Sequence, residues 1–182
     1  MKINPTNLPG CLEICPEVFC DTRGKFVKVF HQGTFAKHKL ETAFVEEYYS
    51  ISRRRVLRGL HFQRPPYDHA KLVYCVLGKI MDVVVDLRMT SPSYGQFVTE
   101  QLSDEKANAL YISSGMAHGF YVLSDTAIVV YKVTSMYSEK HDSGILWNSL
   151  GIPWPDKHPI LSERDKTFVA FSNFQSPFRF QA

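Results

Sequence analysis

Glycine and proline interrupt this chain so often that it leaves little room for a long helix. Residues 53–88 show the pattern most clearly: two β-rich runs, Val56–Gln63 and Lys71–Leu77, flank a Pro-Pro loop, and Ile80–Arg88 follows after Gly78. Aromatic residues make up 13% of the sequence and favour strands over a helical bundle. Short strands at this spacing predict an all-β sandwich or barrel.

The remaining segments extend this pattern. The first 20 residues contain three prolines and predict an extended N-terminal arm. Short helical turns are expected at Thr34–Leu40 and after Ser103, a candidate N-cap. The tail from Ser149 onward is rich in proline and is expected to fold back over the body of the domain. Further strands are expected at Leu12–Ile14, Val18–Phe19, Lys25–Phe30, Phe44–Ser52, Phe97–Leu102, Leu110–Ile112, Gly119–Leu123 and Ala127–Thr134.

Length and composition favour one cytoplasmic domain spanning residues 1–182. The N-terminus has no apolar core of a signal peptide, and no apolar run approaches the length of a membrane span. A net charge of +3 is too small to indicate nucleic-acid binding. The four cysteines form no C-x-x-C pair, so reduced thiols are expected, with Cys75 a small buried hydrophobe.

Five arginines between Arg53 and Arg64 admit two interpretations. They protect a solvated strand edge, or some of them bind an anion such as phosphate. Asp82 and Asp86 share one face of their strand and are expected to meet solvent or basic neighbours.

Strand parity gathers four ionisable side chains. Lys71 shares a face with apolar Val73, and Tyr131 with Val129, while His61 and His118 fall on comparably apolar faces of their own runs. If these faces point into a barrel, then a base, a cation and a phenol meet in one cavity. The alternatives are hydrogen-bonded structural histidines, a strand-end lysine that reaches water, and an ordinary strand tyrosine.

Two further patterns limit this hypothesis. Arg58 has the opposite parity to His61, so both face the cavity only if Gly59 introduces a bulge. Metal-binding cupins carry a His-x-His pair, but Phe62-Gln63 follows His61 and Gly119-Phe120 follows His118. No metal is therefore expected.

Several short motifs lie along the chain from about Phe19 to Asp165. They are the Asp21–Gly24 turn, Arg58–Gln63 (RGLHFQ) with Lys71–Val73, Gly115–Phe120 (GMAHGF) with Tyr131-Lys132, Gly144–Asn148 (GILWN) and Leu161–Asp165 (LSERD). Jointly these motifs are highly specific, and they resemble the dTDP-4-dehydrorhamnose 3,5-epimerase family.

The resemblance implies an all-β cupin jelly-roll barrel with short helical turns and an N-terminal strand arm. It implies a homodimer that exchanges its N-terminal strands, and an isomerase that needs no cofactor. The implied substrate is a nucleotide-diphosphate sugar, a 4-keto-6-deoxyhexose epimerised at C3, C5 or both. No nucleic-acid or membrane partner is expected.

The resemblance also implies catalytic roles. His61 is the expected general base, since an unperturbed histidine titrates near working pH. Asp165 pairs with His61 and fixes its tautomer. Lys71 stabilises negative charge at O4, and Tyr131 donates a proton from the opposite sugar face.

The implied binding residues surround these groups. Arg23, Arg58, His118 and Arg164 hold the diphosphate or the sugar, with Arg23 and Phe19 supplied by the partner subunit. Tyr137 stacks on the nucleotide base. Asp142 stands where the family usually has Glu, which leaves its role open.

Departures from the family pattern concern the nucleotide. Lys28 replaces an acid, Glu46-Glu47-Tyr48 replaces Gln-x-Asn, and Ser113 replaces a proline. Lys28 can donate to the N3 acceptor of cytosine and Glu46 can accept from its amine, so a CDP-sugar is one hypothesis. The alternative is a local salt bridge that never touches the base.

Two other functions are kept open. A nucleotide-sugar 3,4-ketoisomerase on a similar barrel moves the carbonyl instead of inverting a centre. A non-catalytic sugar-binding cupin binds without proton exchange.

Overall fold

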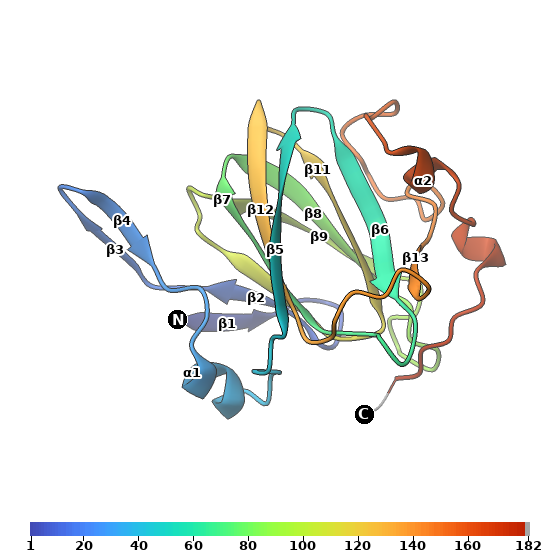
Figure 1. Ribbon diagram of the computed structural model, residues 1–182, viewed down its shortest axis with the longest axis horizontal. Helices are drawn as coiled ribbons and strands as arrows, with labels where there is room; N and C mark the ends of the chain where they lie inside the picture. Colours follow the sequence, from blue (N-terminus) through green and yellow to red (C-terminus); the bar gives the residue numbers. More distant parts are fainter. Residues whose placement is uncertain (181–182) are drawn as a thin grey trace.

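Two antiparallel sheets face each other in the computed structural model, which describes residues 1–180 (Figure 1). The six-stranded sheet has the order β1-β2-β10-β7-β12-β5, and the five-stranded sheet has the order β13-β6-β11-β8-β9. In both sheets, strands that are adjacent in space are often distant in sequence, because the chain crosses repeatedly from one sheet to the other. This is the all-β jelly roll that the sequence predicts.

The elements are short, as the glycines and prolines require. The strands of the six-stranded sheet are β1 (Lys2–Pro5), β2 (Cys11–Cys15), β5 (Glu46–Arg53), β7 (Lys71–Leu77), β10 (Ala109–Ile112) and β12 (Thr126–Val133). Those of the five-stranded sheet are β6 (Leu57–Gln63), β8 (Lys79–Asp86), β9 (Phe97–Ser103), β11 (Met116–Val122) and β13 (Asp142–Gly144). The others are β3 (Val18–Asp21), β4 (Gly24–Val27), α1 (Gln32–Lys37), α2 (Glu163–Lys166) and the 3-10 turn Phe171–Asn173.

The main core lies between the sheets. Val73 and Cys75 from β7, Val129 and Tyr131 from β12, and Val84 from β8 are all buried in one cluster. The alternating parity inferred for β7 and β12 is therefore confirmed, as is a buried Cys75. Burial of these side chains contributes about 25 cal/mol per Å2 of apolar surface removed from water.

The C-terminal tail covers the outer face of the five-stranded sheet, on the right of Figure 1. Phe178 and Ile152 are buried there, and Trp154 packs against the same cluster as Leu60 and Val85. The prediction that the tail folds back over the body is confirmed.

The N-terminal hairpin β3–β4 projects away from the barrel, on the left of Figure 1. Its strands pair only with each other among the described residues. Phe19 and Phe26 are 59% and 61% exposed. By contrast, α1 packs Phe35 on the six-stranded sheet, beside Leu72 and Tyr111. An isolated two-stranded hairpin is marginally stable in water, so this one is expected to need a partner.

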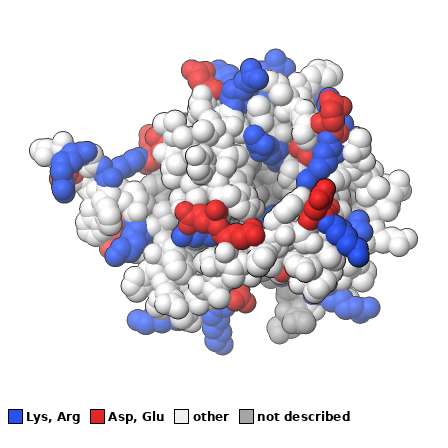
Figure 2. Space-filling model, in the orientation of Figure 1, with Lys and Arg blue, Asp and Glu red and all other residues white. Residues whose placement is uncertain are grey.

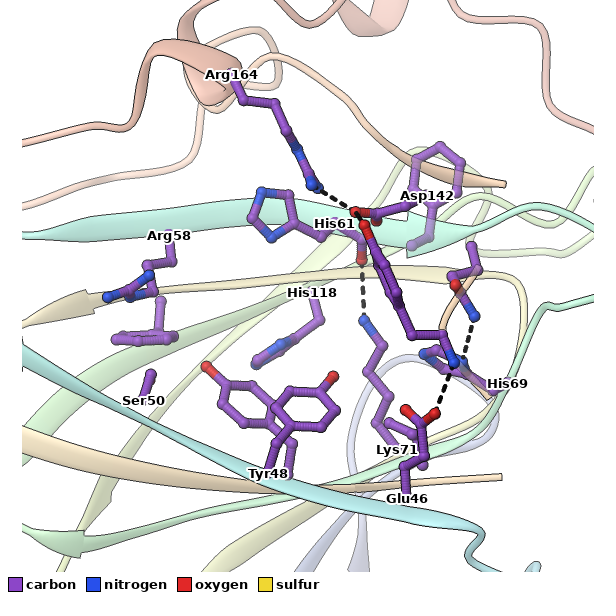
Figure 3. A pocket seen from close by; sticks show the side chains of 16 residues that line it. Glu46, Tyr48, Ser50, Arg58, His61, His69, Lys71, His118, Asp142 and Arg164 are labelled. Carbon is purple, nitrogen blue, oxygen red and sulfur yellow. Dashed lines mark hydrogen bonds and ion pairs between the residues drawn. The ribbon is translucent and has the colours of Figure 1, made fainter. Parts of the chain in front are cut away.

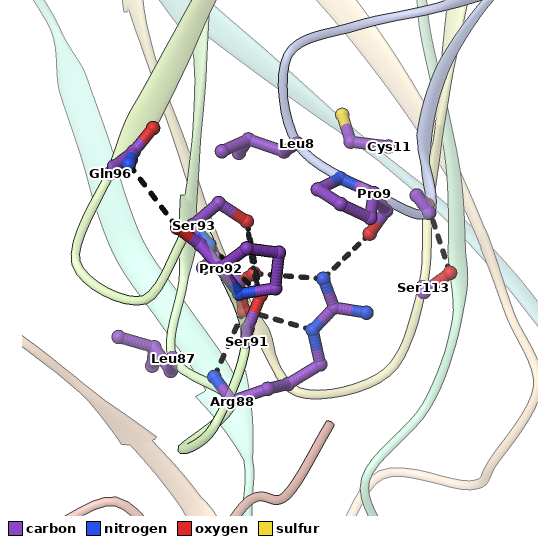
Figure 4. Close-up of polar contacts among 12 residues, drawn as sticks. Leu8, Pro9, Cys11, Leu87, Arg88, Ser91, Pro92, Ser93, Gln96 and Ser113 are labelled. Carbon is purple, nitrogen blue, oxygen red and sulfur yellow. Dashed lines mark hydrogen bonds and ion pairs between the residues drawn. The ribbon is translucent and has the colours of Figure 1, made fainter. Parts of the chain in front are cut away.

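A buried polar cluster ties the N-terminal segment to the end of β8 (Figure 4). Arg88 donates to both carboxylate oxygens of Asp86, at 2.9 and 2.8 Å, and to the carbonyl oxygen of Pro9. Ser91 and Ser93 also donate to Asp86. Burial raises the pKa of Asp86, but these hydrogen bonds outweigh it and leave the pKa below its ordinary value. The expectation of a basic neighbour for Asp86 is confirmed.

Some local expectations differ from the structure. β1 and β13 form where no strand is predicted, because β1 pairs with β2 and β13 with β6 despite weak local signals. The capped turn expected after Ser103 does form, because Ser103 Oγ accepts from the Lys106 amide and the Ser103 carbonyl oxygen accepts from the Ala107 amide. Within residues 1–180 no helix is long and apolar enough to cross a membrane. On the face shown in Figure 2, acidic and basic side chains are interspersed.

Candidate active site

A cavity of about 430 Å3 opens between the two sheets (Figure 3). It takes side chains from both walls of the barrel and from the segment around α2. Its lining residues are Glu46, Tyr48, Ser50, Arg58, His61, Phe62, Gln63, His69, Lys71, His118, Phe120, Tyr131, Val133, Tyr137, Asp142 and Arg164. Asp165 lies directly behind this wall, so the structure brings together eleven of the fourteen residues singled out from the sequence.

A bulge in β6 lets both Arg58 and His61 reach the cavity. His118 pairs with His61, whereas Phe120 pairs with Arg58, so β6 carries one extra residue between the two pairs. The condition that strand parity set for a shared cavity, a bulge at Gly59, is therefore met. Gly59 has φ +129°, and a Cβ there would lie 2.4 Å from the Cα of Gly119. The two glycines allow the backbones of β6 and β11 to touch.

The other arginines of this segment lie outside the cavity. Arg54 pairs with Asp125, and Arg55 pairs with Asp156 on the surface. These arginines therefore form a solvated edge, and Arg58, which donates to Ser52, is separate from them.

His61 and Asp165 form a tight pair. Nε2 of His61 lies 2.6 Å from Oδ1 of Asp165, and Oδ2 also accepts from the Gly59 amide. Ser162 caps α2 by accepting from the Asp165 amide, which fixes the carboxylate in place. Burial raises the pKa of Asp165, but the hydrogen bond and charge of His61 outweigh it, so the pKa lies below its ordinary value. With the proton on Nε2, Nδ1 keeps its lone pair.

Lys71 is a buried cation. Its residue is only 6% exposed, and Nζ donates to the carbonyl oxygen of His61 at 3.1 Å. Burial lowers the pKa of Lys71 to about 8, although the carboxylates of Asp142 and Asp82 oppose this. The alternative of a strand-end lysine that reaches water is wrong.

Tyr131 lies on the opposite sheet from His61. Its ring stacks on Tyr48, with centroids 5.0 Å apart and planes 20° apart, and meets the His118 ring edge-on. Burial raises the pKa of the Tyr131 phenol, and the Asp82 carboxylate raises it further, so the phenol keeps its proton at neutral pH.

Asp82 lies behind the cavity wall and meets a basic neighbour, His118, but the sequence analysis gave it no part in the site. Oδ2 lies 2.8 Å from Nε2 of His118, and both residues are buried. Oδ1 has no hydrogen-bond partner among the described residues, and burial raises the pKa of Asp82. The sequence did carry a signal for this position. Asp82 lies on the same face of β8 as Ile80 and Val84, and this places its carboxylate on the inward face of the strand.

The mouth of the cavity is crossed by a chain of polar contacts. Glu46 accepts from the Tyr137 amide at 2.9 Å, and Asp142 pairs with Arg164 at 2.5 Å. Because the Tyr137 hydroxyl also lies 3.5 Å from Oδ2 of Asp142, these contacts link β5, β13 and α2 (Figure 3). Glu46 and Tyr137 are residues expected beside the nucleotide base, and Arg164 is one expected to hold the diphosphate or the sugar.

Three expected binding residues lie outside this cavity. Phe19 and Arg23 lie on the projecting hairpin, where Arg23 pairs with Asp21, and Lys28 follows β4 and is exposed. Within residues 1–180 Lys28 forms no ion pair with Glu46, so the local salt bridge is wrong. These three side chains cannot complete the cavity of their own protomer in this arrangement.

Three polar residues on the cavity wall were also missed: Ser50, Gln63 and His69. His69 lies 2.9 Å from Ser135 and 3.2 Å from Nε2 of Gln63, and burial followed by the charge of Lys71 lowers the pKa of His69 to about 3. His69 is therefore neutral and adds no second cation. No group of three or more His, Cys, Asp or Glu side chains in the described chain is arranged to hold a metal ion.

The fold and the cavity define a class of protein: a cupin-type jelly roll whose interior carries a histidine–carboxylate pair, a buried lysine and a phenol. Such a set suits general acid–base chemistry at carbon next to a carbonyl group.

Comparisons with known proteins identify one family within this class. The sequence model described as dTDP-4-dehydrorhamnose 3,5-epimerase matches residues 5–173. The enzyme of that name from Shigella flexneri is 45% identical over 170 residues, covering 91% of this chain and 93% of its own. A dTDP-4-dehydrorhamnose 3-epimerase from Streptomyces niveus is 39% identical, covering 91% and 82%.

A solved structure agrees with these relatives. The dTDP-6-deoxy-D-glucose-3,5-epimerase from Legionella pneumophila, in complex with dTDP-4-keto-L-rhamnose, superposes with a TM-score of 0.94 and 34% identity, covering 100% of this chain and 99% of that chain. This chain belongs to the dTDP-4-dehydrorhamnose 3,5-epimerase family and is an isomerase.

Proposed function

We propose that this protein epimerises a dTDP-linked 4-keto-6-deoxyhexose at C3, C5 or both, through an enolate and without a cofactor. The observation that carries this proposal is the placement of His61 and Tyr131 on facing sheets, with Lys71 buried in the same cavity. A base and an acid on opposite walls suit removal of a proton from one face of a sugar and its return on the other.

The proposed reaction uses these three groups in sequence. Nδ1 of His61 takes the hydrogen next to the 4-keto group, and the electron pair of the broken C–H bond moves into an enolate. The Lys71 cation stabilises the negative charge at O4. The Tyr131 phenol then gives its proton to the same carbon from the opposite face. Solvent protonates the phenolate and takes the proton from His61 before the next turnover.

The nucleotide is proposed to lie at the cavity mouth. Tyr137 is 59% exposed there and suits stacking on a base, while Arg58, His118 and Arg164 suit the diphosphate or sugar. Relatives named for dTDP-linked sugars favour thymine over cytosine. Isothermal titration with dTDP and CDP tests this, and tighter binding of CDP would restore the alternative based on Lys28 and Glu46.

The active form is proposed to be a cytoplasmic homodimer that exchanges its N-terminal hairpins. Phe19 and Phe26 are exposed on the hairpin, and Tyr49 and Ile51 are exposed on the outer face of edge strand β5. Burial of these four side chains in a second copy removes a large apolar surface from water. Four free cysteines support a reducing compartment.

A complementation experiment tests the exchanged site. Arg23→Ala and His61→Ala chains are each inactive or weak alone, but a mixed dimer assembles one site with both residues intact. Co-refolding equal amounts is expected to recover about a quarter of wild-type activity, because half of random dimers are mixed and half of their sites are intact. No recovery in a mixture that dimerises would assign Arg23 to its own chain.

The reaction is tested by NMR in heavy water with dTDP-4-keto-6-deoxyglucose. Deuterium at C3 and C5 identifies a double epimerase, and deuterium at C3 alone identifies a 3-epimerase. A carbonyl that moves to C3 would replace the proposal with a 3,4-ketoisomerase, and absence of exchange would leave only sugar binding. His61→Ala is expected to abolish exchange at both carbons, whereas Tyr131→Phe mainly impairs epimerisation at C5.

A further inference from the structure

A second tyrosine in the cavity is not used by the proposed reaction. Tyr48 on β5 is the direct cross-strand partner of Tyr131 on β12. The two rings stack at 5.0 Å and 20°, and the labelled Tyr48 ring overlaps a second ring in Figure 3. The His118 ring meets the Tyr131 ring edge-on, with centroids 5.9 Å apart. The proposed proton donor therefore contacts two other rings.

The unequal burial of the two tyrosines indicates which of them positions the other. Tyr131 is 9% exposed, whereas Tyr48 is 45% exposed and stands at the outer edge of the sheet. The His118 ring is itself fixed by Asp82, which lies 2.8 Å from its Nε2. Tyr131 thus contacts one ring that is itself held in place, and its stack with Tyr48 is a second aromatic contact.

The position of the Tyr131 hydroxyl decides which carbon receives its proton. C3 and C5 flank the same carbonyl carbon, so a small tilt of the ring moves the hydroxyl from one carbon toward the other. Transfer to carbon requires near-contact geometry, so this tilt changes the two rates unequally. Loss of a stacked aromatic partner shifts an orientation equilibrium by roughly twofold to tenfold.

We propose that Tyr48 is a positioning residue that sets the ratio of C5 to C3 epimerisation by holding the Tyr131 ring. The proposal rests on the proposed function of the cavity. It requires the Tyr48 ring but not the Tyr48 hydroxyl.

The experiment compares three variants in the heavy-water NMR assay. Tyr48→Val removes the stack but suits an edge strand, and Tyr48→Leu repeats the loss with a different side chain in case the first variant folds poorly. Tyr48→Phe is the matched control, because it keeps the ring and removes only the hydroxyl. The readout is the ratio of initial deuterium incorporation at C5 and C3, which is independent of the amount of active enzyme.

The expected result is a roughly twofold to tenfold change of this ratio in Tyr48→Val and Tyr48→Leu, with the wild-type ratio in Tyr48→Phe. An unchanged ratio in the Val and Leu variants would overturn the inference, and so would a Phe variant that behaves like them, because the hydroxyl would then matter. Wild-type protein without exchange at either carbon would instead refute the proposed function itself.

Discussion

Replacement of Asp165 by Asn tests the proposed catalytic pair of His61 and Asp165 at the residue whose two carboxylate oxygens both accept hydrogen bonds. Asp165 accepts two hydrogen bonds, from Nε2 of His61 through Oδ1 and from the Gly59 amide through Oδ2. Asn offers one acceptor and one donor at these positions. If its oxygen faces His61, its NH2 group faces the Gly59 amide, and two donors oppose each other. If its oxygen faces Gly59, its NH2 group faces Nε2, and the proton of His61 moves to Nδ1.

Both arrangements reduce the basicity available at Nδ1. The substitution removes the negative charge that stabilises the imidazolium, and a hydrogen bond to a charged group contributes about 1.5–3 kcal/mol. An unsatisfied buried amide or a wrong tautomer adds about 1 kcal/mol or more. Together these costs predict a kcat that is about 100- to 1,000-fold lower, because each 1.4 kcal/mol is a factor of ten.

Steady-state kinetics measure the effect of Asp165→Asn on kcat, and urea unfolding measures its effect on stability separately. KM is expected to change little, since Asp165 lies behind His61. Asp125→Asn is a matched control, because this carboxylate is 94% exposed and pairs only with surface Arg54. A folded Asp165→Asn variant with a kcat within fivefold of wild type would refute the role of the pair.

Three other substitutions test the cavity. Lys71→Met should abolish most activity but raise the free energy of unfolding at pH 7 by up to about 3 kcal/mol, since burial moves the pKa from 10.5 to about 8. The unfolded state binds more protons between these pH values, so wild-type stability should approach that of the variant as pH rises from 8 to 10.5, while wild-type kcat/KM falls with loss of the cation. Equal stability of both proteins at pH 7 would show that Lys71 is solvated. Gly119→Ala should cost about 2 kcal/mol in urea unfolding, because its Cβ would lie 2.7 Å from the Arg58 carbonyl oxygen. The Cβ of Gly33→Ala would meet only the exposed His31 ring, at 3.3 Å, and this variant should be neutral or slightly stabilising. Asp82→Asn should lower kcat, because Oδ2 of Asp82 holds the His118 ring. The other carboxylate oxygen, Oδ1, has no hydrogen-bond partner among the described residues, so the substitution disturbs only the contact with His118. An unchanged kcat would make Asp82 purely structural.

The barrel could be predicted from the sequence because its strands carry strong local signals. β7 (Lys71–Leu77) was predicted with its observed bounds, and its parity placed Lys71 on the inner face. β1 and β13 could not be predicted, because the prolines around β1 and the polar sequence of β13 give no alternation. Their strand conformation depends on pairing with β2 and β6, which is a tertiary effect.

The strand residues that line the cavity were predicted better than its mouth, for a physical reason. Side chains such as Lys71 and Tyr131 project from strands whose parity fixes their direction. Glu46 was correctly placed at the cavity, but its hydrogen bond to the Tyr137 amide joins a strand to a loop and leaves no trace in either local sequence. Lys28 follows the projecting hairpin and lies outside the cavity of its own chain, where strand parity assigns it no neighbour.

The most informative sequence feature was the position in β6 where the regular alternation of side chains breaks down. Regular alternation places Arg58 and His61 on opposite faces, yet both line the cavity. The extra residue fits because Gly59 and Gly119 lie back to back, with neither position able to hold a Cβ. The bulge interrupts the regular hydrogen-bond ladder in the middle of a buried sheet. It also lets an arginine and a histidine of the same strand line one cavity. A glycine at such a point in a strand is therefore better evidence for a functional site than either charged residue alone, because packing by itself does not require the irregularity.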